Sequence, residues 1–333
     1  MLQLFRHFVA QKDLEVIPVL KLSRLKNKSR IESVLGHECR ALFPWMLFPG
    51  KDSLYLGPDF KLNTWGSLPR VVTIHDMVVF EEKYNRPEFF LKGIREMTEV
   101  LNSSSLDAVL VNSEFTKNQV LRFFPHLQNR LHMTYLGCNR TSAPPMARSL
   151  GLPEQYILFL GTLEKRKNVL GVIKAFEILK SKGFEEKLVL AGAWGFGSED
   201  IQTAIETSPY KSDIVHLSYV PDDKLAELYQ RAQVFFFPSW YEGFGIPVLE
   251  AMSLGCPVVT SLGGALQEIC GDAAAFADPG NPEQMAEALT QVLSDDRFRE
   301  ALKVKGLVRS QKFTWEKCAQ ETLEVFKKVL RKS

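Results

Sequence analysis

The 333-residue sequence has little that would mark a secreted, membrane-spanning or zinc-binding chain. Its five cysteines are odd in number and form no C-x-x-C pair, so neither a zinc site nor a disulfide framework is supported. They are Cys39, Cys138, Cys256, Cys270 and Cys318. No apolar run is long enough to span a bilayer, and the amphipathic stretch at residues 1–13 lacks the layout of a signal peptide. We therefore expect a soluble, cytoplasmic protein in a reducing compartment.

An excess of charge of one sign is also absent. Charged residues make up 24% of the chain and the formal net charge is +2, so no nucleic-acid partner is expected. Residues 1–141 hold 19 Lys and Arg against 14 Asp and Glu, a net +5, and the remainder holds 22 against 25, a net −3. The front part is thus the part suited to face an anionic partner.

From residue 156 onward, apolar strands alternate with amphipathic helices, which predicts parallel βαβ units. Strands are expected at 156–161, 187–192, 214–220, 234–239, 257–261 and 273–278. Their nearly continuous apolarity is typical of strands covered on both faces. Ligands of such doubly wound sheets bind outside the carboxyl ends of the strands.

The front part is less regular but also predicts an α/β lobe. Strands are expected at 15–20, 70–76 and 107–113, and helices near 86–102 and 114–123. Because the chain opens on a helix, we expect this lobe to lack its first strand and glycine-rich loop. The turn-rich stretch 139–155 suggests a boundary between a front lobe at 1–145 and a rear lobe at 146–315. Residues 316–333 are expected to form a C-terminal helix that can cross back to the front lobe.

The stretch "WYEGFGIPVLEAMSLGCPVV", residues 240–259, sets two glutamates around a strand-to-helix turn. Gly243 and Gly245 permit a tight turn with close approach of a ligand, and Pro247 suits the first turn of a helix. Glu242 then lies in the turn and Glu250 near the start of the helix. A helix start favours a phosphate and carboxylates accept hydrogen bonds from sugar hydroxyls, so the stretch suits a nucleotide sugar. Solvated glutamates beside a capped helix are the alternative.

A second strand-end stretch, "GTLEKRKNV" at residues 161–169, places Arg166 and Lys167 where another anion could bind. A solvated surface pair is the alternative interpretation. These stretches, with the closing "FTWEKCAQETLEVF", resemble the retaining family 4 glycosyltransferases, with their E-x7-E signature and the "RKN" branch that often includes mannosyltransferases. The resemblance is close over 156–325, moderate over 70–140 and weak over 1–69. It implies the GT-B fold, two Rossmann-like doubly wound lobes that face a cleft.

The resemblance also implies roles for individual residues. Lys167, with Arg166, would contact the donor diphosphate, Glu242 the hydroxyls of the donor sugar, and Glu250 the ribose. His75 would lie across the cleft beside the transferred sugar, although a histidine at a strand end is more often structural. Further donor-binding residues implied are Gly161, Thr162, Tyr219, Val220, Gly243, Phe244, Gly245, Gly263 and Gly264.

Some positions depart from the family pattern or add to it. Thr162 stands where many members have an arginine, for which Arg166 is the expected substitute, and Ser218 stands where glycine is usual. Ser113 and Glu114 match another strand-end segment that could face the cleft. No D-x-D triplet occurs, and the pairs Asp222–Asp223 and Asp295–Asp296 fall at expected helix starts or surface segments, so we expect no metal.

The resemblance implies a retaining, metal-independent hexosyltransferase without a cofactor. Its donor would be a GDP-sugar or UDP-sugar, with mannose favoured, and its acceptor a saccharide or lipid-linked saccharide. The leaving diphosphate would take the acceptor's proton on the face that it leaves. A non-catalytic or weakly active nucleotide-sugar-binding subunit, or another GT-B enzyme such as an epimerase or phosphorylase, remain as alternatives.

Residues 21–30 hold five basic side chains, and an aromatic, apolar segment follows at 42–50. Basic clusters attract anionic lipid head groups, and Trp and Phe suit the membrane interface. The alternative interpretation is that 21–30 form a solvated loop and that 42–50 are core residues. Peripheral association with the inner face of a membrane is therefore a hypothesis.

Overall fold

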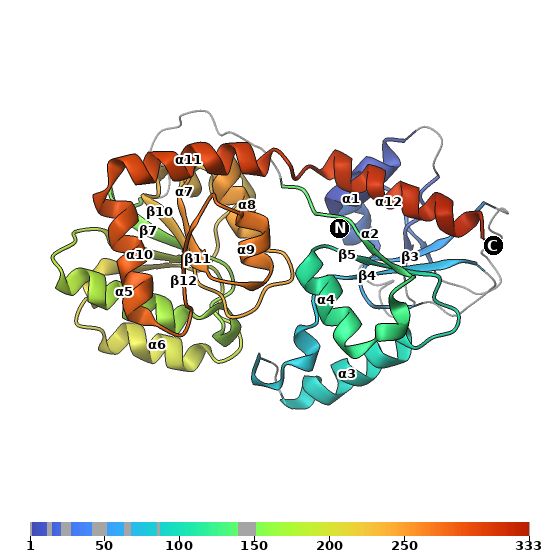
Figure 1. Ribbon diagram of the computed structural model, residues 1–333, viewed down its shortest axis with the longest axis horizontal. Helices are drawn as coiled ribbons and strands as arrows, with labels where there is room; N and C mark the ends of the chain where they lie inside the picture. Colours follow the sequence, from blue (N-terminus) through green and yellow to red (C-terminus); the bar gives the residue numbers. More distant parts are fainter. Residues whose placement is uncertain are drawn as a thin grey trace.

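The computed structural model describes residues 2–11, 15–20, 28–41, 52–62, 68–84, 87–138 and 151–332. They form two α/β lobes side by side, a front lobe with a four-stranded sheet and a rear lobe with a six-stranded sheet (Figure 1). In the sequence, the strands of the front sheet come before residues 139–150 and the strands of the rear sheet come after them. The expected boundary at 145 and most of the turn-rich stretch therefore lie outside the described residues.

The rear lobe confirms the six strands predicted from the apolar runs. They are β7 (Tyr156–Leu160), β8 (Lys187–Ala191), β9 (Ile214–Leu217), β10 (Val234–Phe237), β11 (Val258–Ser261) and β12 (Ala275–Ala277). All neighbouring strands are parallel, in the order β12-β11-β10-β7-β8-β9. Every residue of the "VFFF" strand β10 is fully buried, as expected of a central strand covered on both faces.

Seven helices of the rear lobe cover this sheet. They are α5 (Val169–Ser181), α6 (Ser198–Thr207), α7 (Asp222–Arg231), α8 (Ile246–Ser253), α9 (Gly264–Cys270), α10 (Pro282–Ser294) and α11 (Asp296–Ser310). Helix α5 packs against α6 and α10, and α8 packs against α9 and α11 (Figure 1). As expected, the paired aspartates at 222 and 295 stand at the starts of α7 and α11.

The order of the rear sheet determines where a ligand would bind. The first strand, β7, pairs with both β8 and β10, so the chain winds outward from β7 in one direction and later from β10 in the other. Such a reversal leaves a crevice at the carboxyl ends of the two central strands. The turns that follow β7 and β10 are the two stretches that carry the predicted site.

The front lobe is built on four parallel strands. They are β3 (Tyr55–Gly57), β4 (Arg70–Ile74), β5 (Ala108–Val111) and β6 (Leu131–Met133), in that spatial order. Helices α3 (Pro87–Leu101) and α4 (Glu114–Phe123) confirm the predicted helices, and the predicted strands at 70–76 and 107–113 correspond to β4 and β5. The residues before β3 include α2 (Lys28–Leu35), which the sequence did not reveal.

The strand predicted at 15–20 is only partly formed. Its last two residues make β1 (Val19–Leu20), which pairs in parallel with β2 (Arg40–Ala41) in a separate two-stranded sheet. Pro18 has no amide hydrogen to donate to a neighbouring strand, which limits the pairing at this point. Within the described residues, the four-stranded sheet therefore begins at β3.

The last helix, α12 (Trp315–Leu330), leaves the rear lobe and packs against α1 (Leu2–Val9) of the front lobe (Figure 1). The rings of Phe8 and Phe326 lie 5.6 Å apart, and His7 Nε2 is 3.1 Å from Glu316 Oε1. Both aromatic rings are buried. The two ends of the described chain thus meet on one lobe, and α12 ties the rear lobe to it.

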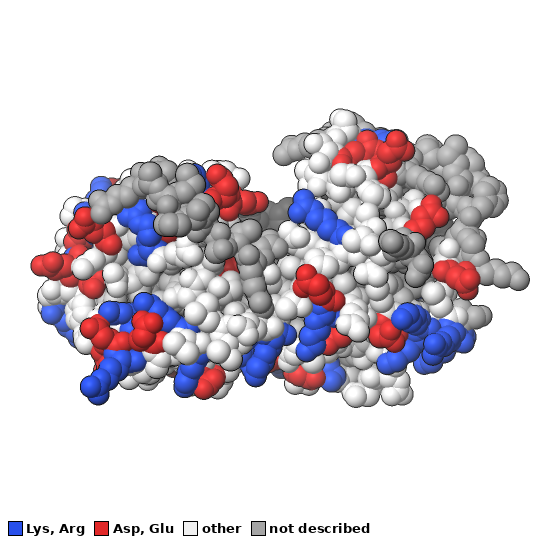
Figure 2. Space-filling model, turned by 90° about the horizontal axis from the view of Figure 1, so that it is seen from above, with Lys and Arg blue, Asp and Glu red and all other residues white. Residues whose placement is uncertain are grey.

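On the face seen in Figure 2, lysine and arginine are interspersed with aspartate and glutamate over both lobes, and the surface is notched between the lobes. Among the residues that the structure describes, no helix is long and apolar enough to cross a membrane. Most of the basic cluster (21–27) and the aromatic segment at 42–50 lie outside the described residues. All five cysteines are buried as free thiols.

Candidate active site

The turn between β10 and α8 has the expected geometry at its glycines. Gly245 adopts a φ of +96°, which is costly for any other residue, and precedes the first residue of α8, with Pro247 in the first turn. Glu242 lies in the turn. Glu250 is the fifth residue of α8 and so lies in its second turn, slightly deeper in the helix than expected.

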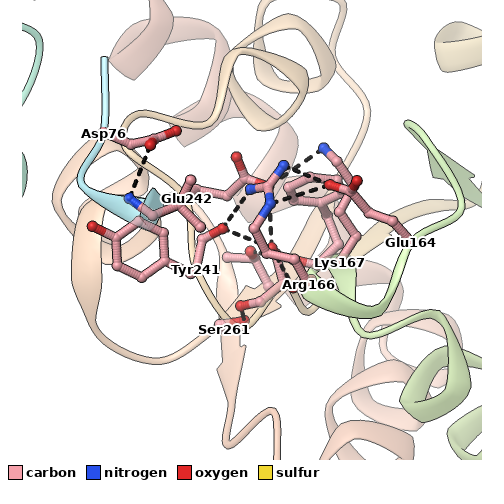
Figure 3. A network of polar contacts seen from close by, with 11 residues as sticks. Asp76, Glu164, Arg166, Lys167, Tyr241, Glu242 and Ser261 are labelled. Atoms are coloured by element: carbon pink, nitrogen blue, oxygen red, sulfur yellow. Dashed lines mark hydrogen bonds and ion pairs between the residues drawn. The ribbon is translucent and has the colours of Figure 1, made fainter. Parts of the chain in front are cut away.

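The carboxylate of Glu242 is surrounded by polar groups from both central strand ends (Figure 3). Its Oε1 lies 3.1 Å from Arg166 Nη1 and 3.4 Å from Lys167 Nζ, and it accepts a hydrogen bond from Ser239 Oγ at 3.1 Å. Only 12% of the Glu242 side chain is exposed. The carboxylate and the two cations, which the sequence assigned to different parts of a donor, therefore lie in one cluster.

Arg166 is fixed by more than Glu242. Its Nη2 donates to Glu164 Oε1 at 2.7 Å and its Nη1 donates to the carbonyl of Tyr241 at 2.7 Å. Burial opposes the charge of Arg166, but Glu242 and Glu164 more than offset this and raise its pKa. The guanidinium is thus a permanent, oriented charge.

Lys167 is the only buried lysine among the described residues, with 11% of its side chain exposed. Its ammonium lies 4.8 Å from the centroid of the Phe237 ring, and a Cβ at Gly161 would come within 3.1 Å of Nζ. Because Gly161 has no side chain, the ammonium has room to lie beside the end of β7 and near the Phe237 ring.

Asn168 orients the basic pair. It is the only described non-glycine residue with a positive φ, at 57°, a conformation that asparagine tolerates better than most residues. Its Nδ2 donates to the carbonyls of Pro238 (3.1 Å) and Pro279 (2.8 Å), which ties the turn after β7 to the turns after β10 and β12. The asparagine of "RKN" thus has a structural reason to follow the two cations.

Glu250 lies on α8, within reach of Tyr229 on α7. The Tyr229 hydroxyl donates to Glu250 Oε2 at 3.2 Å. Burial raises the pKa of Glu250, and this hydrogen bond partly opposes the rise. A carboxylate that is partly desolvated and held by one donor has acceptor capacity left for a hydroxyl pair.

The front lobe brings the end of β4 to this cluster. His75 Nε2 lies 2.9 Å from the carbonyl of Pro58, so Nε2 must carry the hydrogen and Nδ1 is the acceptor of the neutral ring. The next residue, Asp76, is half-buried and accepts from the Val78 amide at 3.0 Å. Burial raises the pKa of Asp76, and the hydrogen bond from Val78 and the charge of Arg166 oppose the rise.

The other predicted donor-binding residues fall into two groups. Tyr219 is 76% exposed after β9, and Gly263 has open space where its side chain would be. Both are accessible to a ligand. Val220 is buried, and Phe244 is buried with its ring 6.4 Å from that of Tyr135. The Phe244 side chain is part of the packing between lobes, so only its backbone is left for a donor.

Two more of these residues lie at close approaches of the chain. Gly161, with Thr162 next to it, meets the neighbouring turn so tightly that a Cβ at Gly192 would lie 2.0 Å from the Gly161 carbonyl oxygen. The ring of Phe115 from the front lobe lies 3.8 Å from the position of a Cβ at Gly264. Gly264 is thus at the boundary between the lobes.

Sequence reasoning did not single out Glu164, Ser239 or Tyr241. Each lies within a few residues of a predicted site residue, on the same strand-end turn, and this proximity was the only available signal. Tyr241 also crosses between the lobes, because its hydroxyl accepts from the Met77 amide at 3.2 Å. In the described part of the chain, no cluster of three or more His, Cys, Asp or Glu could hold a metal ion.

Comparisons with known proteins agree with this architecture. Residues 147–308 match the family model described as Glycosyl transferases group 1. The chain is 35% identical over 315 residues to O-antigen chain mannosyltransferase B of Escherichia coli, covering 90% of this chain and 81% of that protein. Its fold matches sucrose-phosphate synthase from Thermosynechococcus elongatus (TM-score 0.67, 24% identity, 80% of this chain and 69% of the other). It also matches WaaG, a glycosyltransferase involved in lipopolysaccharide biosynthesis (TM-score 0.66, 17% identity, 81% and 77%).

Proposed function

The chain belongs to the group 1 glycosyltransferases and has their two-lobed GT-B fold, and from this premise we propose that it transfers mannose from a nucleotide diphosphate donor to a saccharide or lipid-linked saccharide. The name of the mannosyltransferase to which it is 35% identical supports mannose as the sugar. GDP and UDP are the two nucleotides proposed for the donor.

The observation that carries this proposal is the cluster of Glu242, Arg166 and Lys167 at the ends of β10 and β7. The crevice between these strand ends is where open α/β sheets bind ligands. Two fixed cations suit a diphosphate, and a carboxylate beside them suits the hydroxyls of the attached sugar. A nucleotide sugar has both parts.

The proposed reaction forms one bond and breaks one at the anomeric carbon. The acceptor hydroxyl attacks that carbon, and the bond to the diphosphate oxygen breaks with its electron pair passing to the diphosphate. The departing phosphate oxygen takes the hydroxyl proton on the same face, so the configuration is retained. This route requires no general base from the protein, and the family resemblance supports it.

In this scheme the cations act on the leaving group. Negative charge grows on the diphosphate as the bond breaks, and Lys167 and Arg166 are already oriented in a shielded site, where such stabilisation is strongest. The sequence has no D-x-D motif that could hold a metal, so we propose that these two side chains stabilise the leaving diphosphate without a divalent metal. No cofactor is proposed.

Glu250 and His75 are assigned to binding and orientation. The Glu250 carboxylate would accept the ribose hydroxyls, for which Tyr229 leaves it acceptor capacity. His75 Nδ1, the acceptor nitrogen fixed by the Pro58 contact, would accept from a hydroxyl of the transferred sugar.

A direct assay tests the proposal. Purified protein is incubated with GDP-mannose or UDP-hexoses and a panel of mannose-terminated acceptors, and the product is analysed by NMR. We expect α-linked mannose from the α-configured donor without added metal and in the presence of a chelator. Product of inverted configuration, or conversion of the donor without any acceptor, would contradict the proposal.

Membrane association is a separate proposal, supported by the basic sequence at 21–30 and the aromatic segment at 42–50. Each basic residue near an anionic surface contributes about 1 kcal/mol, so five could hold the chain reversibly. Flotation with vesicles containing anionic lipid tests this. Neutralising the five residues should release the protein, and equal flotation of the variant and the natural chain would argue against the proposal.

A further inference from the structure

A glutamate outside the proposed donor site joins the two lobes. Glu268 lies on α9 of the rear lobe, and its carboxylate reaches the start of α4 in the front lobe. The Glu114 amide donates to Oε1 at 2.8 Å and the Phe115 amide donates to Oε2 at 2.9 Å. Helices α4 and α9 lie next to each other at the boundary of the lobes (Figure 1).

These contacts complete the cap of α4. The first four amides of a helix have no partner within the helix and need one from elsewhere. In α4, the Lys117 amide makes the first bond within the helix, to the Ser113 carbonyl, and the Thr116 amide before it donates to Ser113 Oγ. The amides of Glu114 and Phe115 are satisfied by Glu268. Two of the amides at the start of this helix are therefore capped from the opposite lobe.

A third donor strengthens the contact. The hydroxyl of Tyr135, which follows β6 in the front lobe, donates to Glu268 Oε1 at 2.9 Å. Burial and the neighbouring Glu268 raise the pKa of Tyr135 to about 12, so the phenol keeps its proton. On the rear lobe, Arg309 holds the end of α9 by donating to the carbonyls of Glu268 (2.6 Å) and Ile269 (2.9 Å).

The same turn of α4 holds the signature turn of the proposed active site. Ser113 Oγ donates to the Gly243 carbonyl at 2.6 Å, and Thr116 Oγ1 donates to the same oxygen at 3.1 Å. The ring of Phe115 packs on the edge of Tyr241, 5.5 Å away. A displacement of α4 would therefore remove the front-lobe donors from the turn that carries Glu242.

We propose that Glu268 is a positioning residue that holds the lobes in the closed, transfer-competent arrangement by capping α4 from across the boundary. The contact is polar, so water can replace each partner when the lobes separate for exchange of ligands. Glu268 is not one of the residues assigned to the donor site, and it acts through α4 and the Gly243 carbonyl on the turn that carries Glu242. This inference rests on the proposed function for its kinetic consequences alone.

Three variants and a control test it. Glu268→Ala removes all three acceptor contacts, Glu268→Gln keeps one acceptor oxygen, and Tyr135→Phe removes one donor. The control is Glu287→Gln, an exposed carboxylate on α10 that no described contact joins to the front lobe. Small-angle scattering of the ligand-free protein reports lobe separation, and thermal melts in the presence of GDP report nucleotide binding.

We expect a larger radius of gyration for Glu268→Ala, a smaller increase for Glu268→Gln and Tyr135→Phe, and none for Glu287→Gln. Loss of charge-assisted hydrogen bonds should lower kcat for Glu268→Ala about tenfold, with GDP affinity unchanged because the proposed nucleotide site lies in the rear lobe. The Gln variant should recover part of kcat.

Unchanged scattering and kcat in Glu268→Ala would overturn the proposal. So would a loss of GDP affinity parallel to the loss of kcat, because Glu268 would then only support the fold of the rear lobe. If Glu268→Ala fails to fold, Tyr135→Phe and Glu268→Gln decide the same question. If the wild-type protein transfers no sugar, the proposed function is refuted. The scattering comparison would still test whether Glu268 holds the lobes together.

Discussion

The backbone of Gly243 packs against the carbonyl of His75, so that a Cβ at residue 243 would lie 2.0 Å from that oxygen and 2.7 Å from the Cβ of Asp76. Gly243 is not among the described residues with positive φ, so the close approach and not the backbone conformation requires glycine here. The signature turn of the rear lobe and the end of β4 in the front lobe are thus in direct backbone contact. Anything larger than hydrogen at this position must push the lobes apart.

Gly243→Ala should therefore separate catalysis from folding. Each lobe keeps its own core, but the extra methyl group displaces the Glu242 turn from His75, and a misplacement of about 1 Å is enough to cost about a hundredfold in rate. Steady-state kinetics and a thermal melt measure the two effects. A wild-type kcat in the alanine variant would show that the contact between residue 243 and the His75 carbonyl is not maintained during turnover.

Lys167→Gln should lower kcat/KM by about a hundredfold or more, because it removes one preorganised charge from the leaving diphosphate. Glu242 keeps its pairing with Arg166, so the fold should survive. Lys182→Gln, an exposed lysine at the end of α5, is the matched control and should behave as the natural chain. Equal kinetics for the two variants would remove Lys167 from the mechanism.

The rear sheet and the place of its site followed from the sequence because the apolar runs β7–β12 are separated by helices with clear starts. The grouping of the site did not follow. The pairing of Glu242 with Arg166 and Lys167 depends on the strand order that puts β10 beside β7, and spacing along the chain cannot reveal it. Glu268 was also missed, since a glutamate inside a short helix is usually a solvated residue.

The front lobe was less predictable for related reasons. Strands β3 and β6 have three residues each, too few for a clear pattern, and β1 is cut short beside Pro18. The packing of α12 on α1 joins residues from opposite ends of the chain.

Glu250→Ala should remove most of the thermal stabilisation by the nucleotide. At a donor concentration a hundredfold above Kd, binding stabilises the natural chain by about 2.7 kcal/mol. Loss of the ribose acceptor should remove most of that shift while the ligand-free variant still melts cooperatively. A panel of GDP- and UDP-sugars in the same assay identifies the base and the sugar. A full shift in the alanine variant would count against the ribose role.

Glu250 also predicts a pH dependence of stability. Burial raises its pKa in the folded protein above the ordinary 4.5, so its contribution to stability is present below that pH and is lost as pH rises through the folded pKa. Without ligand at pH 7, Glu250→Gln should therefore be more stable than the natural chain, by on the order of 1 kcal/mol. Urea unfolding at several pH values should show the gap closing below pH 4.5. A difference in unfolding free energy that widens on acidification would contradict a raised pKa for Glu250.

The most direct test of the central claim is a crystal structure of the protein with an intact nucleotide sugar. The account predicts diphosphate oxygens at hydrogen-bond distance, about 3 Å, from Lys167 Nζ, with the ribose on Glu250 and the sugar hydroxyls on Glu242. A donor bound away from the ends of β7 and β10, or one that leaves both glutamates without contact, would contradict it.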